Sequence, residues 1–191
     1  DAYKLRNKPW SFREQQNPKS AIVVPRVSSE RRFYIPVGIV VQDTIVSDRC
    51  FLIPDGDYVT FSIIVSRMHM VWMRLTCGRL KSDYNYSRDL TYNTFIWPDL
   101  TEGQKAQLKQ SAKDILKFRI STKKNLAELY NPETMPAELL ELHKRNDALV
   151  ESCYREKPFA SDEERLSFLL GLYNQKIQEL EVNKKLSKSK K

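Results

Sequence analysis

The sequence predicts an α+β fold, in which a small mixed sheet with an embedded helix is followed by an all-α helical bundle. Up to residue 99, short β-branched runs alternate with turn residues, which is typical of strands. After Pro98, apolar residues recur every three or four positions, as they do on one face of a helix. We therefore expect a first domain over residues 1–99, a helical domain over 100–185 and a basic, disordered tail over 186–191. A chain of 191 residues can bury a core in one domain or in two small ones.

The first domain contains three predicted strands, over residues 21–25, 33–41 and 50–54. Pro36 suits an edge strand or a bulge, because proline cannot donate a ladder hydrogen bond. The Pro-Asp-Gly-Asp sequence at 54–57 is a strong turn signal. Residues 58–65 are apolar and β-branched, and they fit a strand or a helix. Trp10 and Phe12 are expected to anchor the polar N-terminal segment onto the core.

The stretch over residues 66–98 changes character halfway. Its first part is an apolar helix, which Gly78 is expected to end. The side chains then alternate, as they do along an extended strand. One face of this segment carries Leu80, Ser82, Tyr84 and Tyr86. The other face carries Lys81, Asp83 and Asn85.

The second domain is predicted to contain three or four helices. Thr101 with Gln104, and Ser161 with Glu164, have the spacing of capping boxes, which mark helix starts. Further helices are expected over residues 126–130 and from Thr134. Five lysines near the end make a basic tail that we interpret as solvated rather than bound to phosphates: Lys184, Lys185, Lys188, Lys190 and Lys191.

The net charge of +8 favours an anionic partner, and nucleic acid is the usual one. Residues 1–99 contain ten Arg and four Lys against ten acidic residues, whereas residues 100–191 contain four Arg and fourteen Lys against fourteen. Both parts therefore carry +4, but arginine is concentrated in the first. Because guanidinium groups suit phosphates and guanine edges, we place the DNA-binding surface in residues 1–99.

Candidate contacts to the DNA backbone fall in two groups. A polar connection before the second predicted strand supplies Arg26, Ser28, Ser29, Arg31 and Arg32. Arg79 and Arg88 flank the alternating segment. A structural ion pair, such as Glu30 with one of the arginines, explains the first group equally well.

Candidate base-reading residues are Lys81, Asp83 and Asn85. Lys81 can donate to guanine acceptors in the major groove, and Asp83 can accept from the cytosine amino group of the same pair. Two residues apart on a strand, they would share a face about 6.5–7 Å apart. Asn85 suits adenine. In the alternative interpretation, Lys81 and Asp83 pair only with each other on the surface.

The chain has no evident catalytic or metal site. His69 and His143 are isolated, and His69 lies on an apolar helix where a structural role fits best. Turn chemistry accounts for Asp55 and Asp57, since no calcium-loop spacing follows them. The three cysteines form no Cys-x-x-Cys pair, which indicates reduced thiols in a cytoplasm. No apolar run approaches the roughly 20 residues of a membrane span.

Two sequence blocks carry a resemblance to a known family. One contains Met68, His69 and Trp72, then Gly-Arg-Leu-Lys-Ser-Asp-Tyr from position 78, and closes on Tyr92, Asn93, Phe95, Trp97 and Pro98. The other runs over residues 24–32 and 34–38. These blocks resemble the target-recognition region of MmeI-like adenine DNA methyltransferases, and the resemblance continues through the helical part.

The resemblance implies that residues 1–99 are the C-terminal part of a DNA target-recognition domain. It implies a larger prokaryotic restriction-modification enzyme that uses S-adenosylmethionine, with or without a nuclease domain. We expect this chain to be a piece of that enzyme. It contains no Gly-x-Gly, and neither Asn17–Pro18 nor Asn131–Pro132 continues into the Asn/Asp-Pro-Pro-Tyr/Phe tetrapeptide of the family. We therefore expect no cofactor and no catalysis in the chain itself.

Two functions follow as hypotheses. The first is recognition of double-stranded DNA for an upstream methyltransferase domain of the same polypeptide. The second is protein interaction, in which the helical part docks on that domain or on a partner subunit. Salt-sensitive binding to duplex DNA distinguishes them, because phosphate contacts release counterions.

Overall fold

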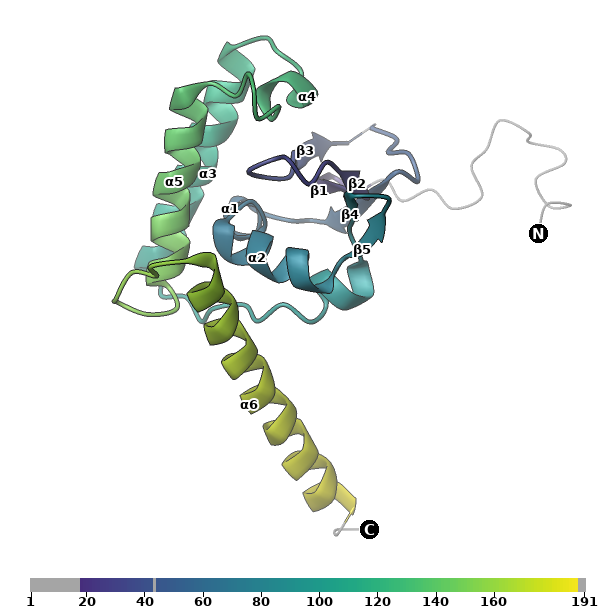
Figure 1. Cartoon of the computed structure of the whole chain (residues 1–191), viewed down its shortest axis with the longest axis vertical. Coiled ribbons are helices and arrows are strands. Elements are labelled where there is room, and N and C mark those ends of the chain that lie inside the picture. Colours follow the sequence, from purple (N-terminus) through teal and green to yellow (C-terminus); the bar gives the residue numbers. More distant parts are fainter. Residues whose placement is uncertain (1–17, 43, 189–191) are drawn as a thin grey trace, which may run out of the picture.

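The computed structural model describes residues 18–42 and 44–188, and the backbone alone over 184–188. Trp10 and Phe12, the expected N-terminal anchors, lie outside the described residues. The architecture is α+β, as predicted: the described strands and two helices occupy the first half, and helices alone the second (Figure 1). Among the described residues, no strand follows Asn85. No described helix is both long and apolar enough to cross a membrane.

The first sheet is built from β1 (Ser20–Pro25), β3 (Gly38–Val41) and β4 (Cys50–Pro54), in the order β3-β1-β4. β1 is central and its Ile22 lies between Ile39 and Ile53. The predicted strand over 33–41 was too long, because only its last four residues join the ladder. Before them, the Val37 N–H donates to the Ile35 carbonyl at 2.9 Å, which makes a local turn instead of a ladder bond.

A second sheet holds β2 (Val27–Ser28), β6 (Asp83–Asn85) and β5 (Gly78–Leu80), in the order β2-β6-β5. All the strand pairs described in both sheets are antiparallel. The prediction of one mixed sheet was therefore wrong in this detail. For β5 and β6 the antiparallel pairing is dictated by their two-residue connection, since parallel strands need a crossover of a dozen or more residues.

Two helices, rather than one, are embedded among the strands. Residues 58–65 resolve as helix α1 (Tyr58–Ile64), whose start is capped by Asp57 accepting from the Thr60 N–H at 2.8 Å. Helix α2 (Arg67–Thr76) follows, capped by Ser66. It ends because Cys77 is extended, and no described glycine has a positive φ. The prediction that Gly78 ends the helix was wrong, since Gly78 already begins β5.

The helical part follows in chain order, after a π-helical turn η2 (Arg88–Tyr92). Helix α3 (Glu102–Ser121) starts with the predicted capping box of Thr101 and Gln104. After α4 (Leu126–Leu129), helix α5 (Ala137–Ser152) begins at Ala137, with Pro136 as its N-cap, and not at Thr134 as predicted. The residue before a proline is disfavoured in the helical region, which keeps Met135 out of the helix. Helix α6 (Asp162–Lys188) leaves the body and projects alone (Figure 1). It includes residues 186–188 of the expected tail, whereas 189–191 lie outside the described residues.

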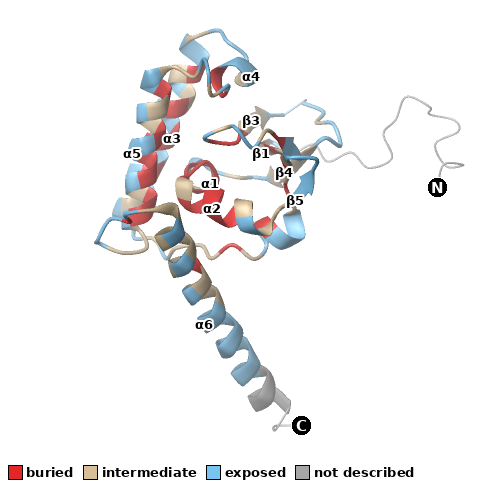
Figure 2. Cartoon of the chain, viewed as in Figure 1, coloured by how far each residue is buried: buried red, intermediate tan, exposed pale blue. Residues whose placement is uncertain are grey.

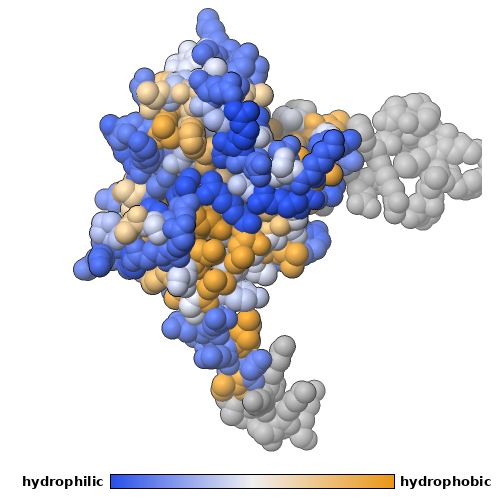
Figure 3. Space-filling view, in the orientation of Figure 1, coloured by the Kyte–Doolittle hydropathy of each residue, from blue (hydrophilic) through white to orange (hydrophobic). Residues whose placement is uncertain are grey.

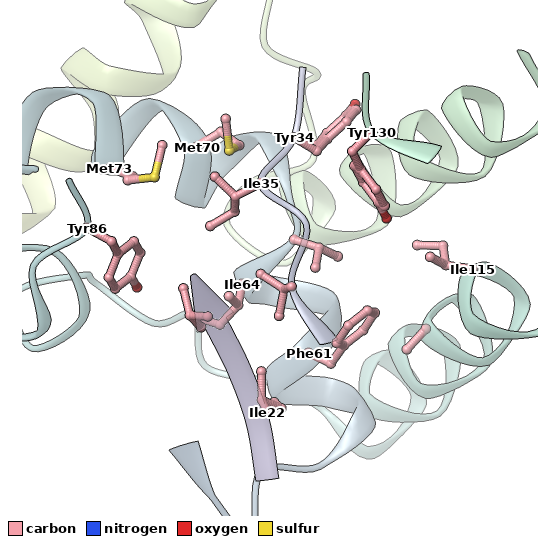
Figure 4. Close-up of a cluster of buried hydrophobic side chains, with 14 of the residues drawn as sticks. Ile22, Tyr34, Ile35, Phe61, Ile64, Met70, Met73, Tyr86, Ile115 and Tyr130 are labelled. Atoms are coloured by element: carbon pink, nitrogen blue, oxygen red, sulfur yellow. The ribbon is translucent and has the colours of Figure 1, made fainter. Parts of the chain in front are cut away.

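The two expected domains share one hydrophobic core. Figure 4 shows Ile22, Tyr34 and Phe61 from the first part against Ile115 and Tyr130 from the helical part. A second cluster joins α2 to α6 through Trp72, Leu108, Phe159 and Leu169. Figure 2 shows the buried faces of α3 and α5 turned inward, while the distal half of α6 is exposed.

A buried amide adds a polar link between three helices of this core. Asn146 of α5 donates from Nδ2 to the Ser62 carbonyl of α1 at 2.8 Å. Its Oδ1 accepts from the hydroxyls of Ser62 and of Ser111 on α3, the latter at 2.9 Å. This buried amide therefore links α5 of the helical part to α1 of the first part and to α3.

Candidate nucleic-acid interface

The alternating segment forms a hairpin rather than one strand. Leu80 pairs with Asp83, and Arg79 pairs with Tyr84, so Lys81 and Ser82 make a two-residue loop. The prediction that Lys81 and Asp83 share a face of one strand was wrong, because the chain reverses between them. The turn also resets the alternation, and Leu80 lies on the same face as Asp83.

Lys81 occupies the tip of this hairpin in a strained conformation. Its φ is 56°, in the left-handed region that favours glycine, and its side chain is exposed. A side-chain-bearing residue held there costs about 1–3 kcal/mol, and such residues cluster at functional sites. Lys81 therefore lies at the hairpin tip with its side chain exposed to solvent.

One face of the sheet β2-β6-β5 is open to solvent, and we call it the open face. It carries the cross-strand pair Val27 and Asn85 and the cross-strand pair Leu80 and Asp83. Val27 is 36% exposed and Leu80 is 54% exposed, while Asp83 and Asn85 are half-buried between them. Asp83 and Asn85 do share a face, as predicted. Neither Val27 nor Leu80 was singled out from the sequence.

The opposite face of the same sheet, which we call the closed face, is buried at Ser28 and Tyr84 but 44% exposed at the Arg79 side chain. It carries Ser28, Tyr84 and Arg79, which are cross-strand neighbours. Ser28 is 4% exposed and Tyr84 is 6% exposed, so both belong to the interior. The Ser28 hydroxyl accepts from Arg32 Nη1 at 3.3 Å. This burial argues against the predicted contact of Ser28 with a phosphate.

The sheet brings the two predicted arginine groups together. β2 lies beside β6, so the connection carrying Arg26, Arg31 and Arg32 adjoins the hairpin carrying Arg79. Arg26 is fixed on both sides, because its N–H donates to the Arg49 carbonyl at 2.9 Å and its carbonyl accepts from the Tyr86 N–H at 2.7 Å.

The arginines of the first group make weak or exposed contacts. Arg31 forms an ion pair with Glu133 at 2.5 Å, and both side chains are about two-thirds exposed. The guanidinium of Arg26 lies 5.2 Å from the Phe51 ring centre and donates to the Asp48 carbonyl. Ser29 accepts from the Arg31 N–H at 3.3 Å within a turn. Exposed pairs of this kind contribute little to stability, which leaves these cations available for phosphates.

Glu30 does form the expected type of ion pair, but with Arg79, at 3.3 Å. Arg79 Nη1 also donates to the Ser82 carbonyl at 2.9 Å, and its guanidinium carbon lies 4.5 Å from the Tyr84 ring centre. Arg88 opens η2 and pairs with Asp89 at 2.9 Å, with both side chains exposed. That hydrogen-bonded pair raises the pKa of Arg88 and lowers the pKa of Asp89.

The two histidines are core residues. His69 Nε2 lies 2.9 Å from the Tyr86 hydroxyl, and His143 Nε2 lies 2.7 Å from the Tyr130 hydroxyl. Burial lowers the pKa of each imidazole to about 3, which keeps both neutral at physiological pH. Asp57 is the α1 cap described above. Within the described residues, no group of three or more His, Cys, Asp or Glu side chains could hold a metal ion.

An open sheet face with a carboxylate and an amide, a lysine-tipped hairpin and adjoining arginines are features expected of a nucleic-acid recognition module. The chain belongs to the MmeI family: the model of the MmeI target recognition domain matches residues 1–99, and the model of the MmeI C-terminal domain matches residues 100–181.

The chain is also similar to a bacterial DNA methyltransferase and to the solved structure of a restriction-modification enzyme. It is 47% identical over 173 residues to DNA methyltransferase A of Bacillus subtilis (strain 168), covering 90% of this chain and 20% of that protein. It also matches the structure of the type IIL restriction-modification enzyme MmeI in complex with DNA, with a TM-score of 0.84 and 37% identity, over 90% of this chain and 23% of that chain. The chain thus spans about a fifth of the length of each relative.

Proposed function

We propose that this chain is the sequence-specific duplex DNA recognition module of a restriction-modification adenine DNA methyltransferase. The observation that carries the proposal is the sheet β2-β6-β5, which places Asp83 and Asn85 on one open face beside an arginine-bearing connection. A polar pair framed by the apolar side chains Val27 and Leu80 suits the edges of bases, which offer both hydrogen-bonding groups and thymine methyls.

The roles follow from position. Asp83 accepts from a cytosine amino group, and Lys81 reaches from the hairpin tip to the guanine acceptors of the same pair. Asn85, about 6.5–7 Å further along β6, reads an adenine at a neighbouring pair. The exposed cations Arg26, Arg31 and Arg88 and the half-buried Arg32, with Ser29, contact phosphates and set the register on the duplex.

Methyl transfer belongs to the remainder of the polypeptide. S-adenosylmethionine supplies the methyl group there, and this chain does not fit the cofactor, because it has five glycines and no Gly-x-Gly loop. The chain by itself is proposed to transfer no methyl group. We place the parent protein in the cytoplasm of a prokaryote, which is supported by its Bacillus subtilis relative.

A second function, docking on the methyltransferase domain, is favoured by α6. Beyond Tyr173, which lies 5.5 Å from the Trp72 ring, this helix projects without described contacts to the body. It exposes Ile177, Leu180 and Val182, and Figure 3 shows apolar atoms on this part. Because a lone helix gains little stability in water, a partner surface is expected to cover it.

The test is binding of the full-length protein to a duplex with its methylation site and to one with that site scrambled. Recognition predicts that the Asp83→Ala, Asn85→Ala variant loses most of the preference but still binds S-adenosylmethionine, which shows that it is folded. An unchanged preference in this variant refutes the proposal. The Ile177→Glu, Leu180→Glu variant should keep the preference but lose methyl transfer if α6 docks on the catalytic domain.

A further inference from the structure

Arg79 is held by three different groups at once. Its Nη1 donates to the Ser82 carbonyl in the hairpin loop and pairs with Glu30 Oε2 at 3.3 Å, while the guanidinium lies over the Tyr84 ring. Glu30 follows β2, so these contacts connect the arginine-bearing connection to the hairpin. Arg79 and Glu30 are both a little under half exposed.

Arg79 lies on the opposite face of the sheet from the proposed base-reading residues Asp83 and Asn85. Its cross-strand partner is Tyr84, which is buried on the closed face, whereas Asp83 and Asn85 lie on the open face. The Arg79 guanidinium, which stacks on the Tyr84 ring, therefore lies on the closed face and contacts the hairpin loop from that side. This position differs from the phosphate contact expected for Arg79 from the sequence.

Arg79 contacts a hairpin loop that has a strained backbone and rests on a very small sheet. Lys81 has φ 56° without being glycine, and the sheet beneath it has strands of only two or three residues. Among the described residues, the bond from Arg79 to Ser82 is the side-chain hydrogen bond that reaches this loop. The planar fork of an arginine can donate, pair and stack together, which a lysine ammonium cannot.

We propose that Arg79 and Glu30 are positioning residues that fix the hairpin tip, and thereby set the discrimination at the base pair that Lys81 reads. This inference rests on the proposed function, since it concerns the same open face and hairpin. Arg79 itself makes no contact with DNA in this account.

The sharpest test is Glu30→Gln in the full-length protein, because its two interpretations predict changes in different properties. Removing an acid beside a DNA-binding surface should only strengthen phosphate binding if Glu30 acts as a surface charge. If it positions the loop, methylation of sites altered at one base pair should rise about 5- to 10-fold. Glu133→Gln is the matched control, since it frees Arg31 with the same change of charge and should leave the methylated site unchanged.

Arg79→Lys completes the test, because it keeps the positive charge and removes the planar guanidinium group that makes the three contacts. It should relax the same base position as Glu30→Gln, and both should speed amide exchange in the paired strands β5 and β6 on either side of the loop. An unchanged site in Glu30→Gln and Arg79→Lys overturns the inference, as does equal relaxation in Glu133→Gln. If the unmodified protein itself shows no site preference, the proposed function fails instead, so the two failures can be distinguished.

Discussion

Val27 and Asn85 are cross-strand partners in a sheet of very short strands, although 58 positions separate them in the sequence. This pairing puts the arginine-bearing connection beside the hairpin, and it gives Asn85 an apolar neighbour on the open face. The proposed DNA surface therefore exists only in the folded chain.

Replacing Arg31 and Arg32 by Ala should weaken binding of the full-length protein to every duplex and flatten its salt dependence. Each lost phosphate contact lowers the slope of log K against log salt by about 0.9. The measurement is a salt titration on the methylated site and on a scrambled duplex. Arg145→Ala is the control, because this exposed arginine lies on α5, outside the proposed interface. An unchanged slope in the double variant would reject the phosphate role.

Asn146→Ala should destabilise the chain by about 1–3 kcal/mol, because it leaves the Ser62 carbonyl and the Ser111 hydroxyl buried without their partner. Urea unfolding followed by circular dichroism measures the change. Asn174→Ala, at an exposed position of α6, should have little effect. Equal stabilities of the two variants would show that the buried amide does not hold α1, α3 and α5 together.

Stability should rise with pH between about 4 and 6.5. In this window the two histidines are neutral in the fold, because burial lowers each pKa to about 3, but they are protonated in the unfolded chain. Asp147 acts oppositely: burial raises its pKa to about 7, despite the lowering effect of its hydrogen bond from Tyr34, so the fold binds one extra proton there. The unfolded chain thus binds a net one proton more, which gives about 1.4 kcal/mol per pH unit.

Asp147→Asn provides the check on this sign. Without the carboxyl, the unfolded chain binds two more protons than the fold, so the slope should roughly double. Free energies of unfolding from urea titrations at several pH values give both slopes. A slope that is unchanged or shallower in the variant would contradict the assignment of Asp147 as protonated in the fold.

Local signals predicted much of the fold but little of the geometry of the site. The cap of α3 by Thr101 and Gln104 and the strand β4 depend on neighbouring residues, and both formed as expected. The pairing of Val27 with Asn85 depends on contacts distant in sequence, which side-chain periodicity does not encode. The hairpin was missed because neither of its loop residues, Lys81 and Ser82, is a glycine or an asparagine, the residues that usually mark a two-residue turn.

The most direct test of DNA reading by this module reverses two charges together, Lys81→Glu with Asp83→Arg, in the full-length protein. Mapping the methylated sites of this variant should show a change confined to one base position. Reversing the exposed pair Glu141 and Lys144 on α5 is the matched control and should leave the site as it was. A variant that stays active and methylates the original site would show that Lys81 and Asp83 do not read DNA.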